Sequence, residues 1–132
     1  MLILLASAKT MDFTSPPLHL PQSEPALMAG TKRLAALCQA LSPEQIATTM
    51  KVSQTIATTT WERFQQWEPT PDPLKARHAL YAFNGAVFKA LDPRSLTPDQ
   101  IERAQTHLRI ASGLYGLLRP LDAILPYRLE MN

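Results

Sequence analysis

The sequence predicts a helix-rich α/β (α+β) protein that contains a partial mixed sheet. Three observations indicate this class: a short apolar run at the N-terminus, several segments whose apolar residues recur at helical spacing, and an alternating segment near residue 110. The length of 132 residues corresponds to one domain or to part of one. We therefore treat residues 1–132 as a single domain.

The first predicted strand covers residues 2–5, which are Leu-Ile-Leu-Leu. A run that is apolar on both faces is typical of a strand buried on both sides, at the centre of a parallel sheet. The prolines that follow between residues 14 and 25 exclude a regular helix and predict an extended connection.

Helical spacing and capping residues predict five helices in the middle of the chain. Their approximate ranges are 24–40, 42–50, 53–67, 74–82 and 97–107. The second and fifth begin alike: a hydroxyl residue, Ser42 or Thr97, precedes proline, and glutamine stands at the third helical position. This order is typical of a capping box with proline at the first helical position. Ser53 has the capping place before the third helix.

Two more strands are predicted in the last quarter of the chain, at residues 108–112 and 127–131. Two glycines and a proline in residues 113–120 predict a sharp turn between them. A doubly buried first strand has few partners in such a chain. We therefore expect either that the chain is a fragment or that a second copy completes the sheet by self-association.

Charge and composition exclude several classes of protein. Thirteen Lys+Arg residues against 11 Asp+Glu give a net charge of +2, and the cations are dispersed, so a basic surface has to be assembled by folding. A single cysteine cannot form an internal disulfide, which favours a reducing compartment. No stretch resembles a signal peptide or reaches the ~18 apolar residues of a membrane span. We predict a cytoplasmic protein without membrane contact.

The segment after the first strand is one candidate site. Lys9 and Thr10 follow the end of a predicted strand, where α/β proteins usually bind ligands, and Asp12 is close by. The glycines of a phosphate-binding loop are missing, which disfavours a nucleoside triphosphate site. Lys9 and Asp12 either face a ligand together or belong to an ordinary surface loop.

Residues 42–67, with the pattern helix, tight turn, helix, are a second candidate site. Such a hairpin directs backbone N–H groups and a helix N-terminus to one side, which suits a DNA phosphate. Lys51 would supply a positive charge and Ser53 a hydroxyl donor. The usual glycine of a DNA-binding hairpin is missing, so the alternative is an ordinary αα-hairpin in a helical layer.

Arginines and tyrosines near the last turns form a third candidate site. They are Arg109, Tyr115, Arg119, Tyr127 and Arg128. Arginine beside aromatic rings suits a planar or phosphorylated ligand. The alternative is internal pairing of these arginines with Asp122 and Glu130.

No metal site, cofactor site or catalytic constellation is predicted. The three histidines have no metal-ligand spacing, and Cys38 lies on an apolar helix stripe. No nucleophile–base pair is evident either. We therefore predict that the protein is not an enzyme.

A longer pattern resembles a known family. It consists of residues 108–122 (LRIASGLYGLLRPLD) and 126–131 (PYRLEM), together with residues 1–4 (MLIL) and 8–10 (AKT). In order and spacing this pattern is similar to the YaaA family of bacterial peroxide stress proteins. The resemblance covers the whole chain but only about the first half of the family's length. It implies a truncated domain with the N-terminal half of the YaaA fold.

The resemblance also implies a function. Family members act in the cytoplasmic response to oxidative stress, bind double-stranded DNA, and help limit free iron and DNA damage. They have a helix-hairpin-helix motif beside a positively charged cleft, and we place this motif at residues 42–67. On this basis we expect phosphate contacts from Lys9, Thr10, Lys51 and Ser53. The cleft would be lined by Asp12, Arg109, Tyr115, Arg119, Asp122, Tyr127, Arg128 and Glu130.

The chain departs from the family pattern at Ala86, Phe88 and Ala90, where the family has Asp, Tyr and Gly, and at Asn132, where it has Gly. The first two changes remove a carboxylate and a phenol that could face a ligand. Two alternatives to DNA binding therefore stay open. One is an enzyme or binder acting on a small nucleotide or base, in a pocket between the Lys9 loop and the turn at residues 119–122. The other is a non-functional truncated copy.

Overall fold

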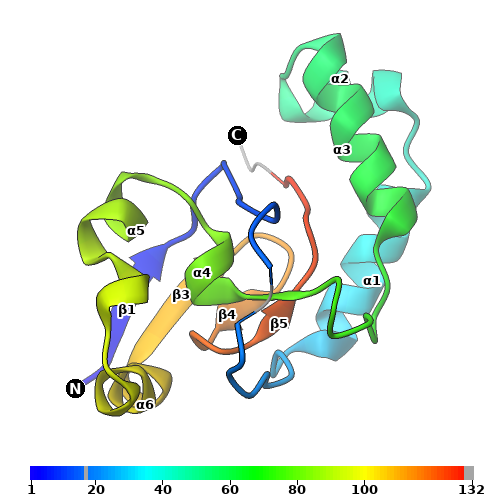
Figure 1. Cartoon of the computed structure of the whole chain (residues 1–132). Helices are drawn as coiled ribbons and strands as arrows, with labels where there is room; N and C mark the ends of the chain where they lie inside the picture. The colour runs from blue at the N-terminus through cyan, green and yellow to red at the C-terminus, as the bar shows by residue number, and fades with distance from the viewer. Residues whose placement is uncertain (17, 130–132) are drawn as a thin grey trace.

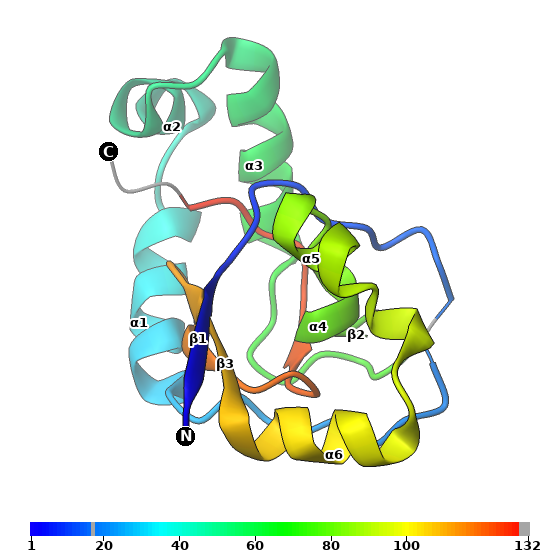
Figure 2. The same cartoon turned by 90° about the vertical axis from the view of Figure 1, so that its left-hand side faces the viewer.

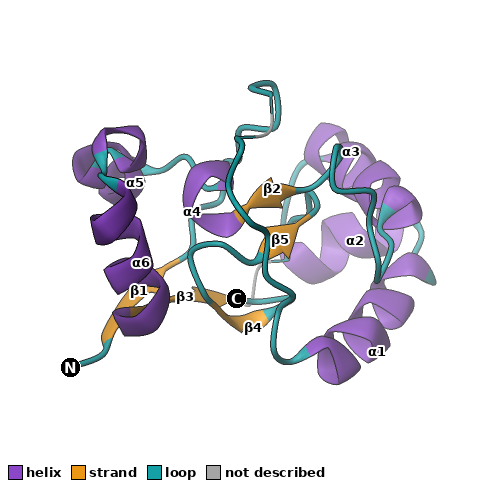
Figure 3. Ribbon diagram, turned by 60° about the horizontal axis from the view of Figure 1, so that its bottom comes forward, coloured by secondary structure: helices purple, strands orange, loops and turns teal. Residues whose placement is uncertain are grey.

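The computed structural model describes residues 1–16 and 18–129 and confirms a helix-rich mixed α/β architecture (Figure 1). The helices are α1 (Met28–Gln39), α2 (Pro43–Met50), α3 (Gln54–Gln66), α4 (Ala79–Ala82), α5 (Ala86–Leu91) and α6 (Pro98–His107), with a 3-10 turn at Pro93–Ser95. The strands are β1 (Ile3–Ala6), β2 (Arg77–His78), β3 (Leu108–Ser112), β4 (Gly116–Leu118) and β5 (Ala123–Ile124). Figure 3 shows α1, α2 and α3 on one side of the strands and α5 and α6 on the other.

The main sheet is mixed, as predicted. β1 and β3 run parallel, with Leu4 opposite Arg109 and Ala6 opposite Ala111. β4 pairs antiparallel with the other edge of β3, which gives the order β1-β3-β4. β2 and β5 form a separate antiparallel pair. The sheet is partial because, within the described residues, β1 and β4 are both edge strands.

The first strand is confirmed, but the prediction that both of its faces are buried is wrong for this chain. Leu2, Ile3 and Leu4 are all exposed. Burial of both faces requires a covering layer on each side and a neighbouring strand at each edge. In the part of the chain that the structure describes, β3 is the only strand beside β1.

The predicted helix starts at Ser42, Ser53 and Thr97 are confirmed by their capping geometry. Ser42 and Thr97 each accept the N–H of the glutamine three residues later, and that glutamine accepts the N–H of the capping residue in return. The hydroxyl of Ser53 accepts the N–H of Ile56. These caps depend on neighbours in sequence alone, so the local pattern is enough to predict them.

Long-range contacts override the helical pattern in two segments. α1 begins at Met28 rather than near residue 24, because Ser23 is held in an extended bridge to Asp122. The predicted helix over residues 74–82 is also wrong, since β2 occupies part of it and α4 alone is helical. The N–H of Leu80 donates to the carbonyl of Pro120, which binds this segment to the last turn of the chain.

The end of the chain differs from the prediction as well. Residues 127–129 belong to no strand, and residues 130 and 131 lie outside the described residues. The hydroxyl of Tyr127 is hydrogen-bonded to Ser112, so its side chain packs inward without strand pairing of its backbone. The short elements α5, β4 and β5 were not predicted, because each has too few residues to show a period.

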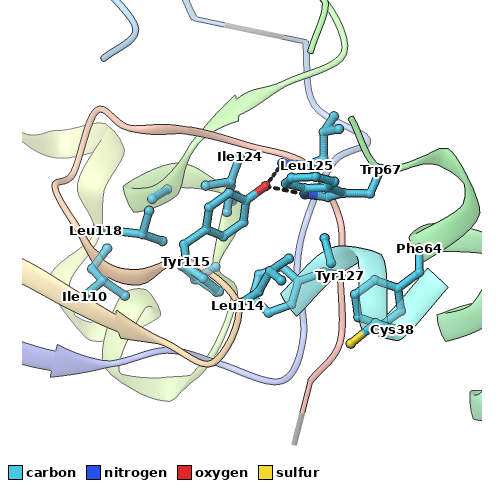
Figure 4. Packing of buried hydrophobic residues seen from close by; sticks show 14 of the residues in the cluster. Cys38, Phe64, Trp67, Ile110, Leu114, Tyr115, Leu118, Ile124, Leu125 and Tyr127 are labelled. Atoms are coloured by element: carbon cyan, nitrogen blue, oxygen red, sulfur yellow. Dashed lines mark hydrogen bonds between the residues drawn. The ribbon is translucent and has the colours of Figure 1, made fainter. Parts of the chain in front are cut away.

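The core connects a helical arm, formed by α1–α3, to a body that contains the sheet (Figures 1 and 2). Cys38 and Phe64 are buried in the arm, and Ile110 and Leu118 are buried in the body (Figure 4). At the junction, the indole N–H of Trp67 donates to the hydroxyl of Tyr115 over 2.8 Å. None of the helices in residues 1–16 and 18–129 has the length and apolar content needed to cross a bilayer.

Candidate functional site

The predicted hairpin is formed by α2 and α3, which are joined by residues 51–53. Lys51 ends α2 in the left-handed conformation, with φ of 56° and ψ of 49°. This conformation is usually taken by glycine at a helix C-terminus, so the missing glycine does not prevent the turn. The N–H of Val52 donates to the carbonyl of Ala47 over 3.2 Å and closes the end of α2.

The outer surface of the hairpin is polar rather than basic. Lys51 and Ser53 are exposed at the turn, and Thr55, Thr58 and Thr59 are exposed along α3. Across residues 42–67 the two cations, Lys51 and Arg63, are matched by two acids. The hydroxyl of Ser53 accepts a hydrogen bond as the cap, and its proton is still able to donate to a phosphate.

The Lys9 loop is held against the segment before α5. The N–H of Asn84 donates to the carbonyl of Thr10 over 3.0 Å, and the N–H of Asp12 donates to the carbonyl of Ala82 over 2.8 Å. The carboxylate of Asp12 accepts hydrogen bonds from Thr14 and Ser15, mainly the hydroxyl of Thr14, and these bonds lower its pKa. Asp12 therefore orders its own loop.

A small cavity of about 250 Å³ lies beside this loop. Asp12, Asn84, Lys89, Asp92 and Arg94 are among its polar lining residues. The guanidinium of Arg94 lies 5.9 Å from the ring centroid of Tyr81, close enough for a cation–π contact. Lys9 and Thr10 are exposed but do not line this cavity.

Arg119 and Asp122 are paired internally, which confirms the alternative considered for them. The Arg119 guanidinium lies 3.1 Å from the Asp122 carboxylate, which is fully buried. The same carboxylate accepts the hydroxyl of Ser23 over 2.6 Å, and Arg119 also donates to the carbonyl of Glu24 over 2.7 Å. These contacts fix the last turn to the segment before α1, so Asp122 has a structural role.

Tyr115 and Tyr127 are buried, and Tyr115 contributes to the wall of a cavity of about 300 Å³ beside Pro25 and Pro71. The hydroxyl of Tyr115 accepts the N–H groups of Trp67 and Leu125 (Figure 4). Burial raises the pKa of Tyr115, and it raises the pKa of Tyr127 to about 12. Both phenols therefore stay neutral at physiological pH.

The remaining predicted cleft residues are dispersed. The Arg109 guanidinium donates to the carbonyls of Gln105 and Leu108, and Arg128 is half-buried. Glu130 lies outside the described residues. Figures 1 and 2 both place the α2–α3 turn, with Lys51, at the far end of the arm from the loop between β4 and β5. The arrangement does not bring Lys51 and Arg119 onto one wall.

Sequence analysis missed a cavity of about 500 Å³ that lies between the arm and the body. Phe13 and Trp67 contribute rings to it, and Arg63, Lys75 and Arg77 contribute cations. These residues come from segments far apart in sequence, so no local motif reveals them. The clustering of prolines at residues 69–73 was the only available signal, since it indicates an irregular segment beside the end of α3.

Three of the four departures from the family pattern fall on α5, and the fourth, Asn132, lies outside the described residues. Phe88 is buried with its ring centroid 5.6 Å from that of Phe83, which places it in the core. Ala86 and Ala90 are exposed. The phenol-to-phenyl change is therefore compatible with packing, and the change to Ala86 leaves a methyl group on the surface.

The described residues contain no group of three or more His, Cys, Asp or Glu side chains that could hold a metal ion. His78 is buried, and its Nε2 is within hydrogen-bond distance of the carbonyls of Leu20 and Pro21. Cys38 is buried on α1, and burial raises the pKa of its thiol. Both side chains are therefore part of the packed interior.

The fold defines a helix-rich α+β protein whose mixed sheet has an open edge and whose helical arm ends in a two-helix hairpin. The chain belongs to the YaaA family: residues 1–132 match the model of the family described as Peroxide stress protein YaaA. This confirms the resemblance seen in the sequence.

Comparison with curated proteins gives the same result. A UPF0246 protein of Shewanella sp. (strain MR-4) is 52% identical over 132 residues, and one of Shewanella baltica (strain OS155) is 49% identical over 132 residues. Both alignments cover 100% of this chain, but 51% and 52% of the relatives' own lengths. The chain thus spans about half the length of the curated relatives it matches.

Proposed function

We propose that this protein acts in the peroxide stress response by binding the backbone of double-stranded DNA through the α2–α3 hairpin. The observation that carries the proposal is the turn itself: an exposed lysine in the left-handed conformation stands directly before the exposed N-terminus of α3. Membership of the YaaA family supplies the link to peroxide stress. The helix-hairpin-helix assignment belongs to this proposal.

The groups at the turn suit a phosphate. The first N–H groups of a helix, here those of Gln54 and Thr55, have no partner inside the helix and point outward along its axis. Lys51 adds a mobile positive charge, and the Ser53 hydroxyl adds a donor. Because the hairpin as a whole carries no net charge, we expect weak binding without sequence preference, with dissociation constants on the order of 10⁻⁴–10⁻⁶ M at physiological salt.

A titration of fluorescent duplex DNA tests this proposal. We expect Lys51→Glu to weaken binding about tenfold at low salt and to reduce the salt dependence by about one released counterion. Lys32→Glu makes the same charge change on an exposed part of α1 far from the turn, and it should bind like the wild type (Figure 1). Undetectable binding at low salt, or equal weakening by both substitutions, would contradict the proposal.

We further propose that DNA binding protects against iron-dependent damage, as the family resemblance implies for a cytoplasmic member. Cells that lack their own family member should survive peroxide better, with less chelatable iron and fewer DNA breaks, when they express the wild-type chain rather than Lys51→Glu. Equal survival with the wild type and with Lys51→Glu would show that peroxide resistance does not depend on DNA binding by the hairpin. A null result for the wild type itself would favour the non-functional copy.

A second candidate function rests on the 500 Å³ cavity, whose volume falls in the usual range of ligand pockets. Arg63 and Lys75 line it, and within the described residues neither is in an ion pair. Cations beside the rings of Phe13 and Trp67 suit a small nucleotide or base, bound at a place other than the predicted pocket. Under this second candidate function, the protein would be either a binder of the nucleotide or base or an enzyme that acts on it.

Thermal shift with single nucleosides and nucleotides distinguishes the two candidates. If a nucleotide raises the melting temperature of the wild type but not of Arg63→Ala, while duplex DNA has no effect, the second candidate replaces the first. Arg103→Ala, an exposed position on α6, is the matched control.

A further inference from the structure

Within residues 1–16 and 18–129, the main sheet is covered on only one face. Residues in register share a face, so Leu4 lies with Arg109, and Ala6 lies with Ala111 and Leu117. On this open face the exposed fractions are 62% for Leu2, 60% for Leu4 and 46% for Leu117. The opposite face contains Ile110 and Leu118, both fully buried.

No strand of the described residues pairs with the outer edge of β1 either. The N–H of Ser7, just beyond β1, donates to the carbonyl of Ala111 on β3, over 3.1 Å. Backbone groups alternate in direction along a strand, so the N–H and C=O groups of Leu4 and Ala6 point away from β3. An apolar edge of this kind is a template for another strand.

We propose that the β1 edge and the open face of the sheet are the docking site for the half of the family polypeptide that this chain does not match. That half would add a strand beside β1 and cover Leu2, Leu4 and Leu117. The proposal is independent of DNA binding.

Two observations favour this occupant. The curated relatives extend over about twice the matched length, so a segment of sufficient size exists in the family. The last described part of the chain also leads toward this sheet, because the carbonyl of Leu129 would lie 3.0 Å from a Cβ atom placed on Gly113, the residue directly after β3. With the occupant in place, both faces of residues 2–5 would be buried, which would explain why this segment is apolar on both faces.

A second copy of this chain would cover the exposed apolar residues of the sheet less completely. If two β1 strands paired across a two-fold axis perpendicular to the sheet, both open faces would lie on the same side. Leu2, Leu4 and Leu117 of both copies would then stay in water. A covering segment buries the edge and the face together.

Co-expression tests the proposal with the 132-residue chain and a tagged polypeptide comprising the unmatched half of the Shewanella sp. (strain MR-4) relative. We expect the two to co-purify as a 1:1 complex by analytical ultracentrifugation. In that complex, hydrogen exchange at the amides of Leu4 and Ala6 should slow by about tenfold or more relative to the chain alone.

Variants at the edge and on the face make the result specific. Leu4→Lys should abolish co-purification, and Leu2→Lys should weaken it, while circular dichroism shows that the chain still folds. Leu37→Lys, at a position on α1 that is 68% exposed, is the matched control and should co-purify like the wild type. Ala6→Pro removes an outward N–H without removing a bond to β3, and it should also weaken the complex.

Three outcomes would overturn the proposal. They are failure of the two wild-type halves to co-purify, equal co-purification of Leu4→Lys and Leu37→Lys, and self-association of the chain that protects the amides of β1 by itself. The last outcome would identify a second copy as the occupant.

Discussion

At the scale of single residues, the buried carboxylate of Asp122 connects two segments that are far apart in the sequence, since Ser23 and Asp122 are 99 positions apart. It accepts hydrogen bonds from the Ser23 hydroxyl and from both the side chain and the backbone N–H of Arg119. Its own backbone carbonyl accepts the N–H of Ala79. One side chain thus fixes the relative positions of the segment before α1 and the last turn.

We expect Asp122→Ala to lower the free energy of unfolding by roughly 2–4 kcal/mol, because it leaves buried donors without an acceptor. The partial exposure of Arg119 keeps the loss below that of a fully buried ion pair. Urea denaturation measures this change. Asp99→Ala, which removes an exposed carboxylate from the first turn of α6, should cost less than about 1 kcal/mol. Similar losses for both variants would contradict the structural role of Asp122.

Tyr127 predicts a loss of stability in alkaline solution. Its pKa in the folded state is about 12, chiefly because of burial, against an ordinary value of about 10. The neutral phenol therefore stabilises the fold fully below pH 10, and this contribution is lost as the pH rises from about 10 to 12. At about 1.4 kcal/mol per pKa unit, the loss is roughly 2–3 kcal/mol.

Urea midpoints at pH 9 and pH 11.5 test this prediction. The wild type should lose more stability between the two values than Tyr127→Phe, which has no ionisable group at this position. A Tyr127→Phe variant with the same pH dependence as the wild type would show that other groups are responsible.

At the scale of secondary-structure elements, two glycines at helices predict opposite effects. Gly30 lies inside α1, and a Cβ atom there would have no other atom within 4 Å. Gly85 precedes α5 with an ordinary φ of −115°, but a Cβ atom there would lie 2.8 Å from the Cβ of Ala8. The first glycine is unfavourable for its helix, and the second allows the Lys9 loop to approach α5.

We expect Gly30→Ala to raise the free energy of unfolding by about 0.5–1 kcal/mol, because alanine has less freedom in the unfolded chain. Gly85→Ala should lower it by about 1–3 kcal/mol, because the chain has to move to admit the methyl group. Thermal denaturation curves of the two variants and the wild type measure the direction of both changes in stability. Stabilisation by both substitutions would show that the contact between Gly85 and Ala8 adjusts without cost.

Elements with local causes are the ones that the sequence predicts well. The caps at Ser42, Ser53 and Thr97 depend on residues within one helical turn, and all three are observed. The helix predicted over residues 74–82 fails because its backbone bonds to segments 40 or more positions away, through contacts such as that between Leu80 and Pro120. A helical period carries no information about such partners.

The same division applies to the candidate site. The hairpin at residues 42–67 has a local pattern and is present as two helices and a turn. The cavity that joins Phe13, Arg63 and Lys75 was not predicted, because folding alone brings these three side chains together. Arg119 and Tyr115 were predicted to line a ligand cleft, but the hydrogen bonds that the structure gives them are internal.

At the scale of the whole molecule, the contact of Trp67 with Tyr115 connects the helical arm to the body. The Tyr115 hydroxyl accepts two buried N–H donors, one from the arm and one from the backbone of Leu125. The rings of Tyr115 and Tyr127 also lie edge to face, with centroids 5.6 Å apart. These contacts therefore hold the end of α3 against the body.

We expect Tyr115→Phe to lower the free energy of unfolding by roughly 2–4 kcal/mol, because two buried donors lose their acceptor. It should also separate the unfolding of the two parts, so that tryptophan fluorescence, which reports on α3 and its end, changes at lower urea than circular dichroism. Coincident transitions in the variant would show that the arm and body stay one cooperative unit. Ser95→Ala, on the exposed 3-10 turn, is a control for general destabilisation.

The burial of Cys38 has a consequence for the proposed role in the peroxide response. Hydrogen peroxide oxidises the thiolate form of cysteine to sulfenic acid, and an apolar site with a raised pKa keeps the sulfur protonated and out of reach. The folded chain should therefore retain an unmodified Cys38 at oxidant doses that convert accessible thiols. Any peroxide resistance that the chain confers would then come from what it binds and not from oxidation of its own cysteine.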